Sequence, residues 1–130
     1  MMRHEEYILL CGVIQQRMAE TVLFVDDESE MLRLYELTYG SEYTVLTAGS
    51  GEEALEVFDD RVDFAFFDRR MPDMAGDEVI ETLRNEGYRT PMGIISAIDP
   101  EVEPSVEYAV YLTKPPDQEQ IHTAIQRHIS

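Results

Sequence analysis

This chain of 130 residues has the length of one domain, and its formal net charge of -17 is strongly acidic. Its hydrophobic content of 44% excludes a disordered chain, and the single Cys11 excludes an intrachain disulfide or a cysteine-based zinc cluster. The acidity argues against direct binding to nucleic acid or to an anionic membrane, and no stretch approaches the roughly 20 apolar residues of a membrane span.

The basic residues are strongly skewed, because nine of the ten cations are arginine and Lys114 is the only lysine. An acid-rich, lysine-poor composition predicts a halophilic source such as a haloarchaeon. Self-repulsion should destabilise the fold at low salt, and added salt should screen it. The composition also indicates that Lys114 has a specific role.

The first 20 residues are predicted to be an N-terminal extension that precedes a domain formed by residues 21–130. Met18 stands just before the first clear strand and could be the natural start. No small-residue cleavage site follows the apolar segment 7–14, which argues against a signal peptide and favours a cytoplasmic protein.

Five short apolar segments have the composition of buried strands: residues 21–25, 43–48, 64–67, 91–95 and 109–112. Each is followed by a helical pattern, with Ser29 expected to cap the first helix and Ser50 with Glu53 to form a capping box at the second. The fourth helix, at about residues 99–108, is the weakest because Pro104 interrupts it. The alternation predicts an α/β fold with a parallel sheet and helices on both faces.

Polar side chains follow four of these strands at their carboxyl ends. Asp26 and Asp27 follow the first strand, Asp68 the third, Ser96 the fourth and Lys114 the fifth. Because the carboxyl ends of parallel strands share one edge of the sheet, these residues should converge there. Three carboxylates in one place repel each other, and a hard divalent cation with oxygen ligands, such as Mg²⁺, would relieve the repulsion.

Asp68 is the best candidate for a nucleophile, because it stands alone on the middle strand. A carboxylate can accept a phosphoryl group as an acyl phosphate, and the transfer needs alignment and charge neutralisation more than covalent help. The compact ammonium of Lys114 suits a phosphoryl oxygen in a crowded site, and Ser96 offers a hydroxyl donor.

The sequence resembles the receiver domain of two-component response regulators, over about residues 21 to 129. Four motifs carry the resemblance: the Asp26-Asp27 pair, Asp68-x-x-Met71-Pro72, Ser96-Ala97 and Lys114-Pro115. It implies a flavodoxin-like (βα)5 fold with strand order 2-1-3-4-5. It also implies that Asp68 accepts its phosphoryl group from a sensor histidine kinase or a phosphotransfer protein.

The resemblance also implies the ligands of a magnesium ion and a switch. Asp27, Asp68 and the backbone carbonyl of Arg70 would bind Mg²⁺ directly, and Asp26 would bind it largely through water. Tyr111 would be the switch aromatic, turning inward as Ser96 moves toward the phosphoryl group. A cis peptide bond between Lys114 and Pro115 is implied as well.

One departure from the family concerns the segment between Ser96 and Tyr111, which is shorter than usual, so a shortened or degenerate fourth helix is expected. The leading interpretation is a phosphoacceptor that is not an enzyme beyond self-phosphorylation and self-dephosphorylation. Its partners would be a kinase and a downstream protein or output domain, and homodimerisation is left open. The alternative is a pseudo-receiver that acts as a phosphorylation-independent interaction module.

Overall fold

The computed structural model describes residues 19–97 and 108–129. These residues form one parallel sheet in the order β2-β1-β3-β4-β5, which comprises β1 (Thr21–Val25), β2 (Thr44–Ala48), β3 (Phe64–Asp68), β4 (Met92–Ser96) and β5 (Val110–Thr113). The helices of the described ranges are α2 (Ser29–Tyr39), α3 (Gly51–Val57), α4 (Gly76–Asn85) and α5 (Gln118–His128). The predicted flavodoxin-like strand order is confirmed.

Two predicted segments fall wholly or largely outside residues 19–97 and 108–129. Nearly all of the N-terminal extension, and residues 99–107 of the expected fourth helix, lie outside the described residues. Among the helices that are described, none is long and apolar enough to cross a membrane.

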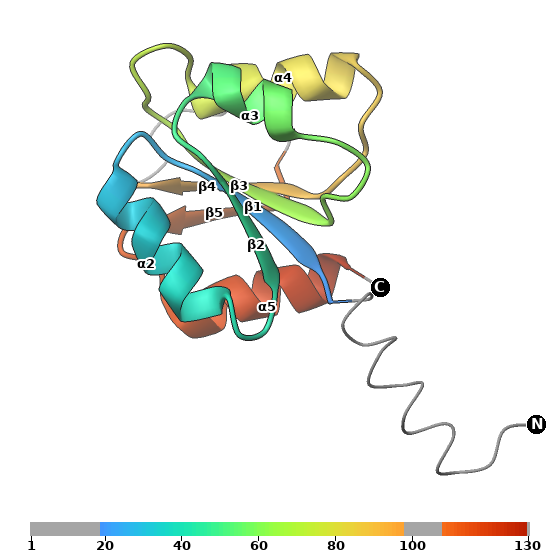
Figure 1. Cartoon of the computed structure of the whole chain (residues 1–130). Coiled ribbons are helices and arrows are strands. Elements are labelled where there is room, and N and C mark those ends of the chain that lie inside the picture. The colour runs from blue at the N-terminus through green and yellow to red at the C-terminus, as the bar shows by residue number, and fades with distance from the viewer. Residues whose placement is uncertain (1–18, 98–107, 130) are drawn as a thin grey trace, which may run out of the picture.

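The sheet lies between two helical layers, with α3 and α4 on one face and α2 and α5 on the other (Figure 1). Every residue of β3 is buried. Successive side chains of a strand point to opposite faces, so Ala65 and Phe67 enter the core under α3 and α4, while Phe64 and Phe66 enter the core under α2 and α5. The prediction that this apolar run is buried on both faces is confirmed.

Of the predicted helix caps, one forms in part and the other is wrong. The Ser50 hydroxyl accepts the Glu53 N–H at 3.0 Å and caps α3 as expected, but the Glu53 carboxylate accepts the N–H of Gly49 and not that of Ser50, so the capping box is incomplete. At α2 the cap position is Glu28, and Ser29 is already helical. The reason is that an Asp26 carboxylate oxygen accepts the Glu28 N–H at 2.9 Å, which closes the turn one residue earlier.

The start of α4 packs directly against the end of β3. A Cβ added at Gly76 would collide with the backbone carbonyl oxygen of Asp68. The Gly76 N–H donates to the carbonyl of Arg69 at 2.9 Å. Only a residue without a side chain allows this approach, which fixes the loop that follows the central strand.

Candidate functional site

The register of the sheet brings the polar strand ends together. Val25 pairs with Phe67, so the residues that follow them, Asp26 and Asp68, emerge side by side. On the other side of β3, Asp68 pairs with Ile95, which precedes Ser96. The Lys114 N–H then donates to the carbonyl of Ser96 at 2.8 Å. The convergence predicted from the sequence is therefore confirmed for all four strands.

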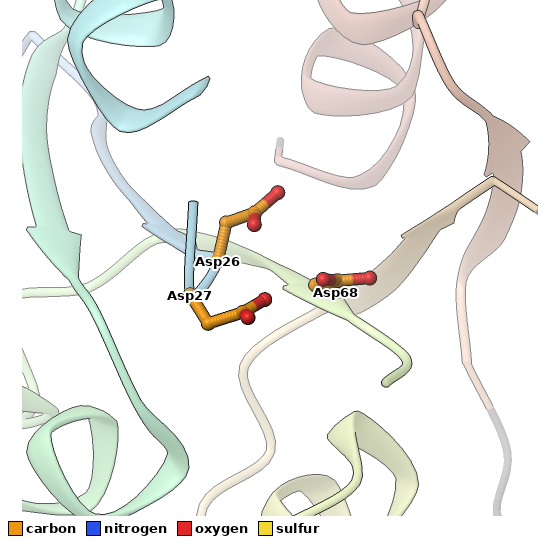
Figure 2. Close-up of side chains that lie close together, drawn as sticks. All are labelled: Asp26, Asp27 and Asp68. Atoms are coloured by element: carbon orange, nitrogen blue, oxygen red, sulfur yellow. The ribbon is translucent and has the colours of Figure 1, made fainter. Parts of the chain in front are cut away.

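Three carboxylates form the centre of the site. One oxygen from each of Asp26, Asp27 and Asp68 lies within 4.8 Å of the others. Figure 2 shows the three side chains at the carboxyl ends of β1 and β3. Asp26 and Asp68 are buried, with 1% and 7% of their surface exposed, whereas Asp27 is exposed. The cluster is therefore closed on one side and open to solvent on the other.

Lys114 provides the positive charge of this cluster. Its Nζ lies 2.7 Å from a carboxylate oxygen of Asp26, 3.4 Å from one of Asp68 and 3.3 Å from one of Glu28. Burial lowers the pKa of the ammonium, but the hydrogen bond and charge of Asp26, with the charge of Asp68, raise it above its ordinary value overall. Lys114 thus stays protonated. The peptide bond between Lys114 and Pro115 is cis, as expected.

The ionised form of the Asp68 carboxyl is disfavoured in this arrangement. Burial and, next, the charge of Asp26 raise the pKa of its carboxyl from 3.8 to about 6, although Lys114 and the backbone N–H of Arg70 act in the opposite direction. A bound cation would stabilise the ionised carboxylate, because its charge offsets both the burial and the repulsion from Asp26.

The raised pKa predicts that Asp68→Asn stabilises the cation-free protein. Because the folded pKa exceeds the unfolded one, ionised Asp68 costs free energy above about pH 6, and the cost vanishes below about pH 4. Asp68→Asn should therefore raise the free energy of unfolding by about 1–3 kcal/mol at pH 8, and by little at pH 4. Denaturant titrations in chelator and constant high salt, at several pH values, measure the difference.

The control for this experiment is Asp73→Asn. Asp73 accepts the backbone N–H groups of Glu52 and Gly51, which lower the pKa of its carboxyl. Its stabilising effect is present above the unfolded pKa and is lost as the pH falls through the folded one, so Asp73→Asn should destabilise the protein at pH 8. An Asp68→Asn variant that is less stable than wild type at pH 8 would contradict the prediction.

A cavity of about 260 Å³ opens over the cluster. Its walls include Asp27, Asp68, Ser96, Lys114 and Arg70, and all of these were expected at the site. Ser96 is buried at the end of β4, where it can present its hydroxyl beside Asp68. The cavity has room for a tetrahedral anion next to the carboxylates, since its volume is several times the roughly 30 Å³ that one molecule of liquid water occupies.

Tyr111 lies outside this cavity. It is half-buried on β5 opposite Ile94 and packs against the core beneath α3 and α4. Its predicted movement toward the site remains a prediction, as does the role of the Arg70 carbonyl as a ligand.

Two residues near the site were not assigned roles from the sequence. Glu28 is an additional carboxylate partner of Lys114, and Arg69 forms an ion pair with Asp77. Glu28 directly follows the acidic pair, which was a usable signal. No spacing pattern in the sequence predicts that the Arg69 side chain contacts α4.

The donor set fits a hard divalent cation. The cluster offers carboxylate oxygens and contains neither histidine nor cysteine, which suits Mg²⁺ and does not suit zinc or copper. The open side of the cluster, at exposed Asp27, leaves room for the waters that Mg²⁺ retains. The structure therefore has an acidic cluster of the composition that binds Mg²⁺.

Comparison with known sequences connects this geometry to one family. The model of the response regulator receiver domain matches residues 22–126. A candidate transcriptional regulator of Haloferax volcanii is 35% identical over 116 residues, which are 86% of this chain and 20% of that protein. The transcriptional regulatory protein GlrR of Escherichia coli K12 is 34% identical over 110 residues, which are 80% of this chain and 25% of that protein. The chain thus spans a fifth to a quarter of these relatives.

Solved structures show the same fold. The chemotaxis response regulator CheY4 of Vibrio cholerae has a TM-score of 0.73 and 29% identity, and the alignment covers 85% of this chain and 98% of that one. The response regulator TrrA of Thermotoga maritima, solved in complex with Mg²⁺-BeF, has a TM-score of 0.76 and 24% identity over 85% of this chain and 99% of that one. This chain belongs to the family of response regulator receiver domains.

Proposed function

We propose that this chain is a phosphorylation-controlled switch in which Asp68 accepts a phosphoryl group from a histidine kinase or a phosphotransfer protein. The observation that supports it most strongly is the position of the Asp68 carboxylate. It lies at the end of the central strand, in the wall of the cavity, 3.4 Å from the ammonium of Lys114 and beside Asp26 and Asp27.

In the proposed transfer, a carboxylate oxygen of Asp68 forms a bond to phosphorus while the bond from phosphorus to the histidine nitrogen of the donor breaks. That nitrogen keeps the electron pair of the broken bond. Lys114 and the hydroxyl of Ser96 donate hydrogen bonds to phosphoryl oxygens and stabilise the charge spread over them. Asp26, Asp27, Asp68 and the Arg70 carbonyl would hold Mg²⁺, which would supply positive charge to offset that of the carboxylates and the phosphoryl group.

The switch would act on a protein partner rather than on a substrate. The curated relatives are named as transcriptional regulators, and each is much longer than this chain. We therefore propose that phosphorylation changes contacts with an output domain or a separate downstream protein in the cytoplasm. The net charge of -17 makes these residues themselves poor ligands for nucleic acid. No turnover is proposed beyond self-phosphorylation and self-dephosphorylation.

The test is phosphorylation by a small-molecule donor. Protein in high salt is incubated with Mg²⁺ and acetyl phosphate, and intact masses are taken for wild type, Asp68→Asn and Asp73→Asn. We expect one phosphoryl adduct on wild type and on Asp73→Asn, sensitive to hydroxylamine and absent in chelator, and none on Asp68→Asn. The same adduct on Asp68→Asn would refute the assignment. A folded wild type without an adduct would favour the pseudo-receiver.

A further inference from the structure

Arg69, the residue after the proposed phosphoacceptor, binds two elements at once. Its Nε and Nη2 each lie 3.4 Å from a different carboxylate oxygen of Asp77 on α4. Its guanidinium carbon lies 5.9 Å from the centre of the Tyr111 ring on β5. The Arg69 side chain is only 25% exposed, so both interactions are made in a partly desolvated position where they are stronger than at an open surface.

Asp77 is a firm anchor for this arginine. It lies in the first turn of α4, its side chain is 14% exposed, and its Oδ1 makes no hydrogen bond among the described residues. The guanidinium is the charge that compensates that buried oxygen. The carbonyl of Arg69 also accepts the Gly76 N–H at 2.9 Å, so its backbone and side chain are both tied to the start of α4.

Tyr111 contacts two neighbours. The Arg69 guanidinium lies over its ring, and the centre of the Tyr108 ring lies 5.7 Å from that of Tyr111. The neighbouring Tyr111 hydroxyl raises the pKa of the Arg69 guanidinium; burial lowers it, and the charge of Asp77 raises it again, so the pKa lies above its ordinary value overall. The arginine therefore remains a full positive charge over the tyrosine ring.

We propose that Arg69 is a positioning residue that, anchored by Asp77, latches Tyr111 in the observed conformation and opposes the phosphorylated form of the switch. This inference rests on the proposed function, and on the switch role that the family resemblance implies for Tyr111, in which the ring turns inward when Asp68 is phosphorylated. Such movement breaks the Arg69–Tyr111 contact, so the contact stabilises only the unphosphorylated form. A contact made in one state alone shifts the equilibrium between the two.

The direction in which removal of Arg69 changes the binding of a phosphoryl analogue distinguishes this latch from a simple charge effect. As a cation beside Asp68, Arg69 would attract an anionic phosphoryl group, so its removal would weaken the phosphorylated form. As a latch, it holds the other form, so its removal would favour the phosphorylated form. The two roles predict opposite shifts in the binding of a phosphoryl analogue.

The experiment titrates beryllofluoride in Mg²⁺ and high salt, followed by NMR of protein labelled with ¹³C in its tyrosine rings. Arg69→Gln and Asp77→Asn should each lower the half-saturating concentration by roughly two- to tenfold, the range expected for losing a partly buried cation–π contact. Both variants should also shift the Tyr111 ring resonances before any beryllofluoride is added. Arg89→Gln, which removes the same charge from an exposed residue, should do neither.

A double-mutant cycle tests whether the effect passes through the tyrosine. In a Tyr111→Ala background, Arg69→Gln should have no further effect on half-saturation. An unchanged or higher half-saturating concentration in Arg69→Gln, or an equal decrease with and without Tyr111, would overturn the latch alone. A folded wild type that takes up no beryllofluoride would overturn the proposed function and the latch with it.

Discussion

Replacing Lys114 with methionine should lower the free energy of unfolding by about 3–5 kcal/mol at pH 8 without divalent cations, because it leaves buried carboxylates without their cation. The ammonium contacts Asp26, Asp68 and Glu28, and the first two are buried. Lys114 also lowers the pKa of Asp68, so its loss raises that pKa further and the destabilisation should shrink as the pH falls toward 5. Denaturant unfolding across this pH range, in chelator, gives the measurement.

Lys114→Arg is the matched control, because it keeps the charge and changes the shape. Lys114→Arg should keep much of the stability that Lys114→Met loses. Its Asp68 should accept a phosphoryl group poorly, since a planar guanidinium occupies more of the cavity. A Lys114→Met protein within about 0.5 kcal/mol of wild type, the usual range for a neutral surface substitution, would show that the ion pairs contribute little.

Phe66→Ala should destabilise the protein by about 3–5 kcal/mol, as expected for a fully buried aromatic. The Phe66 ring stacks with those of Phe64 and Phe24, at 4.5 Å and 5.4 Å between ring centres, and only 1% of the residue is exposed. A Cβ at Gly93 would come within 3.2 Å of this ring, which shows how closely β4 packs against it. Equilibrium unfolding in high salt measures the loss.

The comparison for this variant is Phe66→Leu, which keeps most of the volume and should cost less than about 1.5 kcal/mol. Domains of this size have total stabilities of roughly 5–15 kcal/mol, so Phe66→Ala can bring the chain near its unfolding threshold. If the two variants are equally stable, the buried volume of the side chain is not the source of the stability assigned to it.

The features that the sequence predicted well depend on short-range pattern and on the geometry of parallel sheets. The apolar run 64–67 indicates a strand buried on both faces, and that strand is the middle of the sheet. Every parallel strand ends at the same edge, so acids and a lysine placed after strands must converge, as Asp26, Asp68 and Lys114 do. Strand order itself came from the family resemblance, since pattern alone does not fix it.

The features that the sequence missed depend on where individual side chains reach. The cap of α2 moved from Ser29 to Glu28 because the Asp26 carboxylate binds a backbone N–H before the helix begins. Arg69 reads as one more charged residue in an acidic chain, yet its long side chain crosses to Asp77 and Tyr111. Such contacts depend on the relative position of α4 and β5, which no local spacing encodes.

The most direct measurement is to locate the phosphoryl group on the chain. Wild-type protein phosphorylated with acetyl phosphate and Mg²⁺ in high salt is reduced with sodium borohydride, which converts an aspartyl phosphate to homoserine. Peptide mass spectrometry then finds the converted residue. Homoserine at position 68 alone is the expected result. Conversion at Asp26, Asp27 or Glu28 instead, or none in protein that is folded, would contradict the assignment of Asp68 as the phosphoacceptor.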